Sequence, residues 1–251
     1  YEGSKCFDEQ IAKKPSIEKH LQISKLYMAE LCNDAKHEIT QDFRDYYIFP
    51  RIQTELLASG GSREFTNEDA FIEEVIRRKK VLISGGYNCG KSTLLKKLFL
   101  RLYNEDYAIL FCSVDSIRGK KIERIIKNCF EDIYGNNSSD YVRYEQIPKE
   151  KKVLIIDDID QVKQSSFDAF LSKIDDKFEF FIFTSNRLLD LNLFERMKEQ
   201  LKAADSIYRY QIMPFYADKR LELIQRIVTL KTTDKSSISK TVHALSDTLT
   251  A

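Results

Sequence analysis

Long apolar runs are missing from this sequence of 251 residues, since no stretch approaches the roughly 18 apolar residues of a membrane-spanning helix. The first residues also lack the charged, apolar and small segments of a secretory signal. An excess of one charge is missing too, because 31% of the residues are charged but the formal net charge is only +1. Nothing global therefore draws the chain to a membrane or to nucleic acid.

Patterns for metal binding or disulfide pairing are also lacking. The three histidines, His20, His37 and His243, are scattered without the spacing of a zinc site. The five cysteines are odd in number and include no Cys-x-x-Cys pair, which predicts reduced thiols and a cytoplasmic protein. These cysteines are Cys6, Cys32, Cys89, Cys112 and Cys129.

The pattern along the chain divides it into three parts. Residues 1–42 include a helical pattern over residues 16–33 and are predicted to be a linker or the end of an N-terminal domain. Residues 43–230 form the main predicted domain, and residues 231–251 begin a helical C-terminal portion. Both ends are abrupt, so we expect a fragment of a longer polypeptide.

Two segments lead into the main domain. Residues 42–52 are rich in aromatics, and Pro50 disfavours helix at Phe49, which predicts an extended arm. Residues 66–80 have helical spacing, with Thr66 and Asp69 at the positions of a capping box.

The main domain alternates predicted strands and helices. Four short runs are apolar on both faces, as in parallel strands covered by helices on both sides, and a fifth strand follows them. The class is therefore α/β with right-handed crossovers. The polar stretch of residues 135–152 is predicted to be a surface loop. The predicted strands are residues 81–83, 108–112, 153–156, 180–183 and 207–213, and the helices between them are residues 91–103, 122–133 and 167–174.

A phosphate-binding loop is the strongest motif. The segment "GGYNCGKS" has the spacing Gly-x-x-x-x-Gly-Lys-Ser, after a predicted strand and before a predicted helix. Such a loop turns its backbone N–H groups toward a phosphate, while the helix adds its positive end. Lys91 would reach the β- and γ-phosphates, Ser92 would bind Mg²⁺, and Thr93 would contact the α-phosphate. The residues predicted to hold the nucleotide here are Gly85, Gly86, Tyr87, Asn88, Cys89, Gly90, Lys91, Ser92 and Thr93.

Carboxylates follow another predicted strand, in "KKVLIIDDID". Strand ends of this kind meet at the edge where α/β sheets bind ligands. Asp157 is predicted to hold Mg²⁺ through water, because Mg²⁺ keeps several waters and takes few carboxylates. Asp158 is predicted to polarise the attacking water, with Asp160 as the rival candidate.

A third strand, in "FEFFIFTSNR", ends in polar residues. Ser185 is predicted to contact the nucleotide, because a polar group at this strand end could sense the γ-phosphate or orient water. A polar strand end that caps the next helix is the equally weighted alternative.

These segments resemble P-loop NTPases in which an additional strand lies between the Walker A and Walker B strands, a plan shared by AAA+ proteins and the STAND class. Four segments are similar to STAND proteins, including NACHT-like members: "YYIFP", "LIIDDID", "FTSN" and "YQIMPFYADKRLELIQRI". The resemblance covers residues 43–230 and implies a three-layer sandwich around a central parallel sheet. NACHT-like members usually read Thr-Ser-Arg at the third strand, whereas here Asn186 precedes Arg187.

The resemblance implies a molecular switch, with an N-terminal effector, this NTPase as gate and oligomeriser, and a C-terminal sensor, often in bacterial antiviral defence. The implied cofactors are ATP and Mg²⁺, and the implied partner is a second copy of the protein, with an unknown trigger. An arginine such as Arg187, Arg196 or Arg220 would complete the site from the same or a neighbouring subunit. Alternatives are an AAA+-like ATPase acting on DNA, a nucleotide-binding scaffold with little hydrolysis, and a small-molecule kinase.

Overall fold

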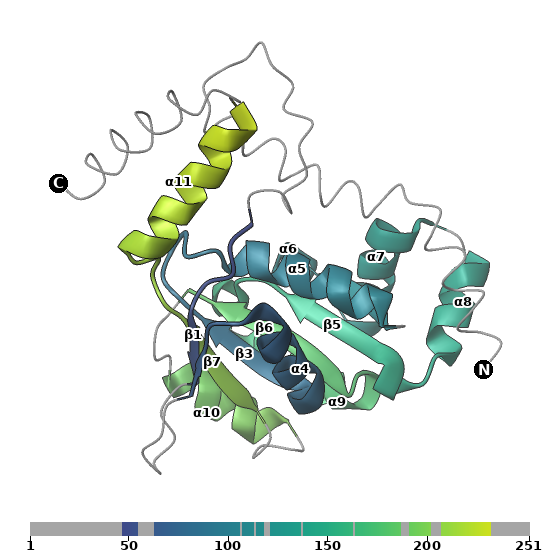
Figure 1. The fold of residues 1–251 in the computed structure, drawn as a ribbon. Helices are drawn as coiled ribbons and strands as arrows, with labels where there is room; N and C mark the ends of the chain where they lie inside the picture. Colours follow the sequence, from purple (N-terminus) through teal and green to yellow (C-terminus); the bar gives the residue numbers. More distant parts are fainter. Residues whose placement is uncertain are drawn as a thin grey trace.

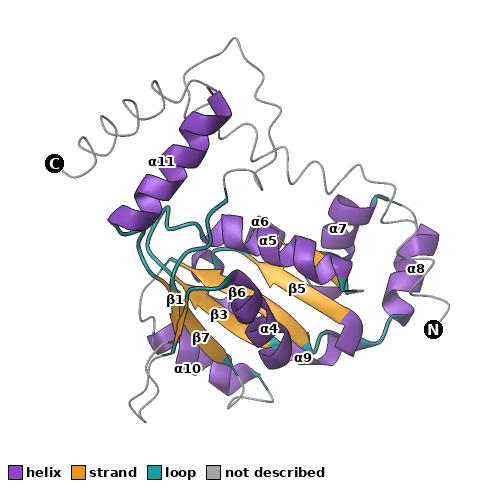
Figure 2. Ribbon diagram, viewed as in Figure 1, coloured by secondary structure: helices purple, strands orange, loops and turns teal. Residues whose placement is uncertain are grey.

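The structure is a computed structural model that describes residues 47–54, 63–105, 107–112, 114–117, 121–136, 138–162, 164–186, 191–201 and 207–231. The helix predicted over residues 16–33, the rest of residues 1–42 and residues 232–251 lie outside the described residues. Within the described part, helices lie on both sides of one sheet (Figures 1 and 2), which confirms the predicted α/β class.

One sheet of seven strands has the order β2-β1-β7-β3-β6-β5-β4. Strands β3 to β7 pair in parallel, whereas β1 is antiparallel to β2 and β7. Because β6 pairs with both β3 and β5, it is the predicted strand between the Walker A and Walker B strands. The strands are β1 (Ile52–Thr54), β2 (Glu64–Phe65), β3 (Lys80–Ser84), β4 (Ala108–Cys112), β5 (Lys152–Ile156), β6 (Phe180–Ser185) and β7 (Tyr208–Ile212).

Helices connect the strands and cover both faces of the sheet. In Figure 1, α4 and α5 lie over the near face, and α9 and α10 lie together on the far face. The helices are α4 (Glu68–Arg78), α5 (Lys91–Asn104), α6 (Val114–Ile117), α7 (Ile122–Tyr134), α8 (Ser138–Gln146), α9 (Gln164–Lys177), α10 (Leu191–Gln200) and α11 (Ala217–Lys231), with short 3₁₀ helices η1 (Lys149–Lys151) and η2 (Ile159–Gln161). None of these helices is long and apolar enough to cross a membrane.

The central strands are buried along their whole length, which explains their continuous apolar sequences. Every residue of β5 and β6 is buried, as are residues 81–84 of β3. The predicted strands and the helices between them are therefore confirmed, with boundaries that differ by a few residues. The described part of the arm, residues 47–50, has no regular structure and continues into β1.

Three predictions about local structure are wrong. Residues 135–152 are not one surface loop, because they form α8 and η1. Tyr144 of α8 is buried against Phe130 of α7, with ring centroids 5.3 Å apart. This packing stabilises a helix that the mostly polar sequence of residues 138–146 does not indicate. The N-cap of α4 is Asn67 and not Thr66, since the Asn67 side chain accepts a hydrogen bond from the backbone N–H of Ala70 at 3.0 Å.

The third wrong prediction is that all five cysteines are free. Cys112 at the end of β4 and Cys129 in α7 form a disulfide, with Cα atoms 5.4 Å apart. Both side chains are buried, and the helix α7 lies directly against β4. Sequence spacing alone gave no sign of this pair, because the two cysteines are 17 positions apart.

A buried carboxylate, Glu74, joins α4 to the sheet. It accepts hydrogen bonds from Arg77, from Nε of Arg78 at 2.8 Å and from the hydroxyl of Tyr210 in β7 at 3.1 Å. Burial acts to raise the pKa of Glu74, but the hydrogen bonds from the two arginines and the tyrosine outweigh it and lower this pKa to about 2. Glu74 is therefore an ion-paired anchor that joins α4 to β7.

Candidate nucleotide-binding site

The glycine-rich loop joins the end of β3 to the start of α5, as the motif requires. The backbone N–H of Gly85 donates to the carbonyl oxygen of Ser185 at 3.2 Å, so the loop begins against the end of β6. Gly90 has φ 95° and α5 begins at the next residue, Lys91. The left-handed backbone at Gly90 turns the chain into the helix, which strains any residue with a Cβ.

Gly85 has no room for a side chain, because the loop packs closely against it. A Cβ added at this position would lie 2.5 Å from Sγ of Cys89 and 3.4 Å from Cβ of Ile212 in β7. Gly86 differs, because a Cβ there would meet no heavy atom within 4 Å. The loop therefore folds tightly onto its own first residue and onto the end of β7.

Lys91 is buried at the centre of the loop. Its Nζ donates to the carbonyl oxygens of Gly85 at 3.1 Å and Gly86 at 2.8 Å, and it lies 3.9 Å from Sγ of Cys89. An ammonium held by two carbonyls and enclosed by the loop is placed to exchange these partners for phosphate oxygens.

Other residues of the loop face outward. Tyr87 is 82% exposed, Asn88 and Ser92 are exposed, and Thr93 is half-buried. Asn88 has φ 58°, a left-handed conformation that asparagine tolerates better than most residues. The hydroxyl of Ser92 is accessible in the first turn of α5, where a metal ion beside bound phosphates would need a ligand.

The carboxylates at the end of β5 are joined to β6 by one hydroxyl. Thr184 is fully buried, and its Oγ1 donates to Oδ1 of Asp157 while it accepts the backbone N–H of Asp158 at 2.8 Å. This hydroxyl fixes both acidic residues with respect to β6. Since β6 also contacts Gly85 through Ser185, β6 links the loop to the carboxylates.

Asp158 has an unusual backbone and an unpaired oxygen. Its φ of 52° and ψ of 48° place it in the left-handed region. Its Oδ2 accepts from Nε2 of Gln161 at 3.2 Å, whereas its buried Oδ1 has no hydrogen-bond partner among the described residues. Burial, followed by the charge of Asp157, raises the pKa of Asp158, and both the charge of Lys91 and a hydrogen bond from the Asn186 side chain oppose this rise. A strained carboxylate with an unused buried acceptor is typical of a functional site.

Asp160 and Ser185 both make contacts around the end of β6. Oδ1 of Asp160 accepts the backbone N–H of Asn186 at 3.0 Å, so this carboxylate holds the turn after β6. The side chain of Ser185 is buried, and Ser185 reaches the phosphate loop through its backbone carbonyl. Arg187 lies outside the described residues, as does the side chain of Arg196, while Arg220 is half-buried on α11.

Lys96 is a residue that the sequence did not single out. It follows Ser92 by one turn of α5, and burial lowers its pKa while the charge of Asp157 raises it. Its ammonium therefore lies within electrostatic range of the end of β5. Only its spacing of four residues from Ser92 could have indicated this.

Mg²⁺ fits this set of oxygen atoms. Ser92 and Asp157 offer a hydroxyl and a carboxylate, which suits an ion that takes most of its ligands from water and phosphate. Among the described residues, no group of three His, Cys, Asp or Glu side chains could hold a metal ion by itself. The protein would thus supply part of the coordination, and a nucleotide would supply the rest.

Comparison with protein-family models matches residues 77–218 to the family described as AAA domain. The chain belongs to this family. The match includes the glycine-rich loop, the carboxylates after β5 and the end of β6. It shows an AAA-type ATPase domain, and it does not distinguish the STAND class from its relatives. A comparison with curated proteins found no match.

Solved structures that resemble this AAA domain include DnaA, RuvB and PCH-2. AMPPCP-bound DnaA from Aquifex aeolicus has 14% identity and a TM-score of 0.43, covering 70% of this chain and 53% of that chain. The RuvB Holliday junction branch migration motor from Thermotoga maritima has 16% identity and a TM-score of 0.41, covering 66% and 50%. PCH-2 from C. elegans has 17% identity and a TM-score of 0.38, covering 64% and 47%. This chain thus spans about half the length of these three proteins.

Proposed function

We propose that this AAA domain binds ATP with Mg²⁺, hydrolyses it slowly, and acts as the switch of a longer STAND-type, NACHT-like signalling or antiviral defence protein. In this proposal the nucleotide state gates oligomerisation and an effector. The observation that carries the proposal is the link through Thr184, which joins both carboxylates at the end of β5 to the strand that contacts the phosphate loop.

The loop would hold the phosphates of the nucleotide. Its backbone N–H groups and the first turn of α5 favour an anion, and Lys91 would leave the carbonyls of Gly85 and Gly86 to bind the β- and γ-phosphates. Ser92 and Asp157 would hold Mg²⁺, which when bound offsets the negative charge of the phosphates. Thr93 would contact the α-phosphate.

Asp158 is the better candidate for the residue that orients the attacking water. Its buried Oδ1 has no partner among the described residues, so it could accept a hydrogen bond from water if nucleotide binding exposes it. Asp160 already accepts the backbone N–H of Asn186, which favours a positioning role for it. Asp158→Asn should therefore slow turnover and keep the nucleotide bound.

A chain of contacts supports the switch. Lys97 of α5 lies over the ring of Tyr47 in the arm, with Nζ 5.3 Å from the ring centroid. Nη1 of Arg226 in α11 donates to the carbonyl oxygen of Tyr47 at 2.6 Å. A shift of α5 when phosphate binds at its first turn would thus change the contacts of Tyr47 and, through them, the position of α11. Moving a population from 1:99 to 99:1 takes about 5.5 kcal/mol of differential affinity, which contacts to a triphosphate could supply.

Nucleotide binding is tested by thermal unfolding. ATP with Mg²⁺ at ~100 times its dissociation constant should stabilise the chain by roughly 2.7 kcal/mol. This corresponds to a melting shift on the order of 5–10 °C. Lys91→Ala should abolish the shift without unfolding the protein, and an unchanged shift in this variant would contradict the assignment of the loop.

The switch is tested on the full-length protein with its trigger present. Light scattering should show a nucleotide-dependent change of mass with ATP and with a non-hydrolysable analogue, and no change with Lys91→Ala. Arg226→Met should weaken the change of mass but keep the melting shift. Equal mass and equal downstream activity in all samples would refute the switch and favour a nucleotide-binding scaffold. Turnover that rises severalfold only when DNA is added would instead favour an ATPase acting on DNA.

A further inference from the structure

An exposed glutamine, Gln161, contacts the carboxylate of Asp158. Its Nε2 donates to Oδ2 of Asp158 at 3.2 Å. An ionised carboxylate only accepts hydrogen bonds, so the donor end of the amide must face it. The bond fixes one oxygen of Asp158 and leaves the other, Oδ1, as the acceptor that has no hydrogen-bond partner among the described residues.

The backbone of η2 brings these two side chains together. Asp158 is the N-cap of this 3₁₀ helix, and Gln161 is its last residue. Side chains three residues apart lie above one another in a 3₁₀ helix, so the amide of Gln161 is placed over the carboxylate of Asp158. The backbone N–H of Gln161 also donates to the carbonyl oxygen of Asp158 at 3.0 Å. The contact between the side chains therefore follows from the local fold.

The turn that carries Gln161 is anchored to the core and to β6. The side chain of Ile159 is 1% exposed. The backbone N–H of Asp158 donates to Oγ1 of Thr184 at 2.8 Å, and Oδ1 of Asp160 accepts the backbone N–H of Asn186 at 3.0 Å. Three consecutive residues before Gln161 are thus fixed, which gives its amide a defined position.

The carboxylate of Asp158 needs more than one contact to hold its orientation. The bond between Cβ and Cγ of an aspartate turns easily, because this torsion has a broad energy profile. The side chain of Asn186 also donates to Asp158, and the charge of Lys91 acts on the same carboxylate. Asp158 therefore lies within electrostatic range of the phosphate loop, and the amides of Gln161 and Asn186 together restrict its rotation.

We propose that Gln161 is a positioning residue for ATP hydrolysis, whose amide holds the carboxylate of Asp158 so that Oδ1 is directed at the attacking water. This inference rests on the proposed hydrolysis of ATP, and the orientation serves the reaction once nucleotide binding exposes Oδ1. In that step the water oxygen bonds to the γ-phosphorus, and the bond from this phosphorus to the β–γ bridging oxygen breaks. The proton of the water passes to Oδ1 and then to solvent, which leaves ADP and phosphate.

The test measures ATP turnover and the melting shift caused by ATP, both with Mg²⁺ and on the whole chain. Gln161→Met keeps the length of the side chain and removes its donor. It should lower kcat about tenfold, the loss expected for one hydrogen bond to a charged group. KM and the melting shift should stay unchanged, because the contact acts on the reacting group and not on bound ATP. Gln161→Lys supplies a donor again and should regain most of the lost turnover.

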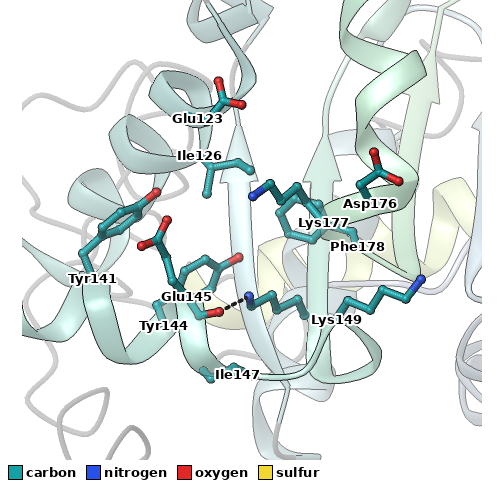
Figure 3. A pocket seen from close by; sticks show the side chains of 11 residues that line it. Glu123, Ile126, Tyr141, Tyr144, Glu145, Ile147, Lys149, Asp176, Lys177 and Phe178 are labelled. Atoms are coloured by element: carbon teal, nitrogen blue, oxygen red, sulfur yellow. Dashed lines mark hydrogen bonds between the residues drawn. The ribbon is translucent and has the colours of Figure 1, made fainter.

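Gln146→Met is the matched control, since Gln146 is an exposed glutamine at the end of α8. Its neighbour Glu145 lines a cavity of about 290 Å³ beside the amino ends of β5 and β6, at the opposite edge of the sheet from Asp158 (Figure 3). This variant should keep the kcat of the wild type.

The outcomes separate this proposal from the proposed function. Turnover that Gln161→Met leaves unchanged or raises would refute the positioning role alone. The same conclusion follows from an equal loss in Gln146→Met, from a loss that appears only in KM, or from no recovery in Gln161→Lys. A wild type that binds ATP and never turns it over would refute the proposed hydrolysis, and the role of Gln161 with it.

Discussion

Gly85→Ala offers a sharp test of the phosphate-loop geometry, because the structure gives the contact that the new methyl group would make. The added Cβ would lie 2.5 Å from Sγ of Cys89, well inside van der Waals contact, and 3.4 Å from Cβ of Ile212. Overpacking of this kind costs roughly 1–3 kcal/mol. For a chain of this size the melting temperature should fall by about 2–12 °C.

Gly86→Ala is the matched control one residue later. Its Cβ would meet no heavy atom within 4 Å, and its φ lies outside the left-handed region. Stability should therefore be unchanged or rise by about 0.4–1 kcal/mol, through the smaller entropy of the unfolded chain. Thermal unfolding with and without ATP and Mg²⁺ compares the two variants. Gly85→Ala should also reduce the shift caused by ATP, because Lys91 donates to the carbonyl of Gly85.

A double-mutant cycle isolates the cause. Cys89→Ala removes the Sγ atom that the new methyl group meets, so the combination of Gly85→Ala with Cys89→Ala should regain most of the lost stability. The coupling energy should lie in the range of about 0.5–3 kcal/mol that contacting residues show. If the two substitutions add without coupling, or if Gly85→Ala melts like Gly86→Ala, the loop does not fold as described.

Three further predictions concern single side chains. Glu74→Gln should lower the free energy of unfolding by on the order of 2–3 kcal/mol at pH 7. This difference from the wild type should vanish as the pH falls from about 4.5 to 2, because the folded pKa of about 2 lies below the unfolded value. Melting curves across this pH range measure the difference. Thr184→Val should cost about 1–3 kcal/mol and slow ATP turnover, since it leaves the N–H of Asp158 and the carboxylate of Asp157 without their partner, whereas Thr184→Ser should retain both. Asn67→Ala should cost about 0.5–2 kcal/mol in urea unfolding through loss of the cap of α4.

The fold was predictable where burial dictates sequence. Strands β5 and β6 are covered on both faces, so their apolar runs are continuous and easy to recognise. The helix α8 was not predictable, because two tyrosines, Tyr141 and Tyr144, pack it against Phe130 of α7 and most of its other positions are polar. The burial of Tyr144 depends on Phe130 in another helix, so the periodicity of the α8 sequence alone does not indicate it.

Some features of the candidate site were predictable from the sequence and others were not. The spacing of the loop and the acids after β5 identified Lys91, Asp157 and Asp158 as neighbours, since parallel strands carry both groups to one edge. The sequence did not indicate that Thr184 joins the two acids, nor that Asp158 adopts a left-handed backbone. Both features depend on the register between β5 and β6, which only the assembled sheet defines.

The order of the strands has a consequence for synthesis on the ribosome. Strand β3, which carries the phosphate loop, pairs only with β6 and β7 among the described strands, and Lys80 of β3 lies opposite Phe181. Translation proceeds at ~5–20 residues per second, so roughly 5–20 seconds pass between the synthesis of the loop and the synthesis of β6, the first strand that pairs with β3. During that interval β3 has two open edges and the loop lacks the carbonyl of Ser185. The nascent chain should thus acquire nucleotide affinity only after β7 has emerged, and chains that stop before it should aggregate.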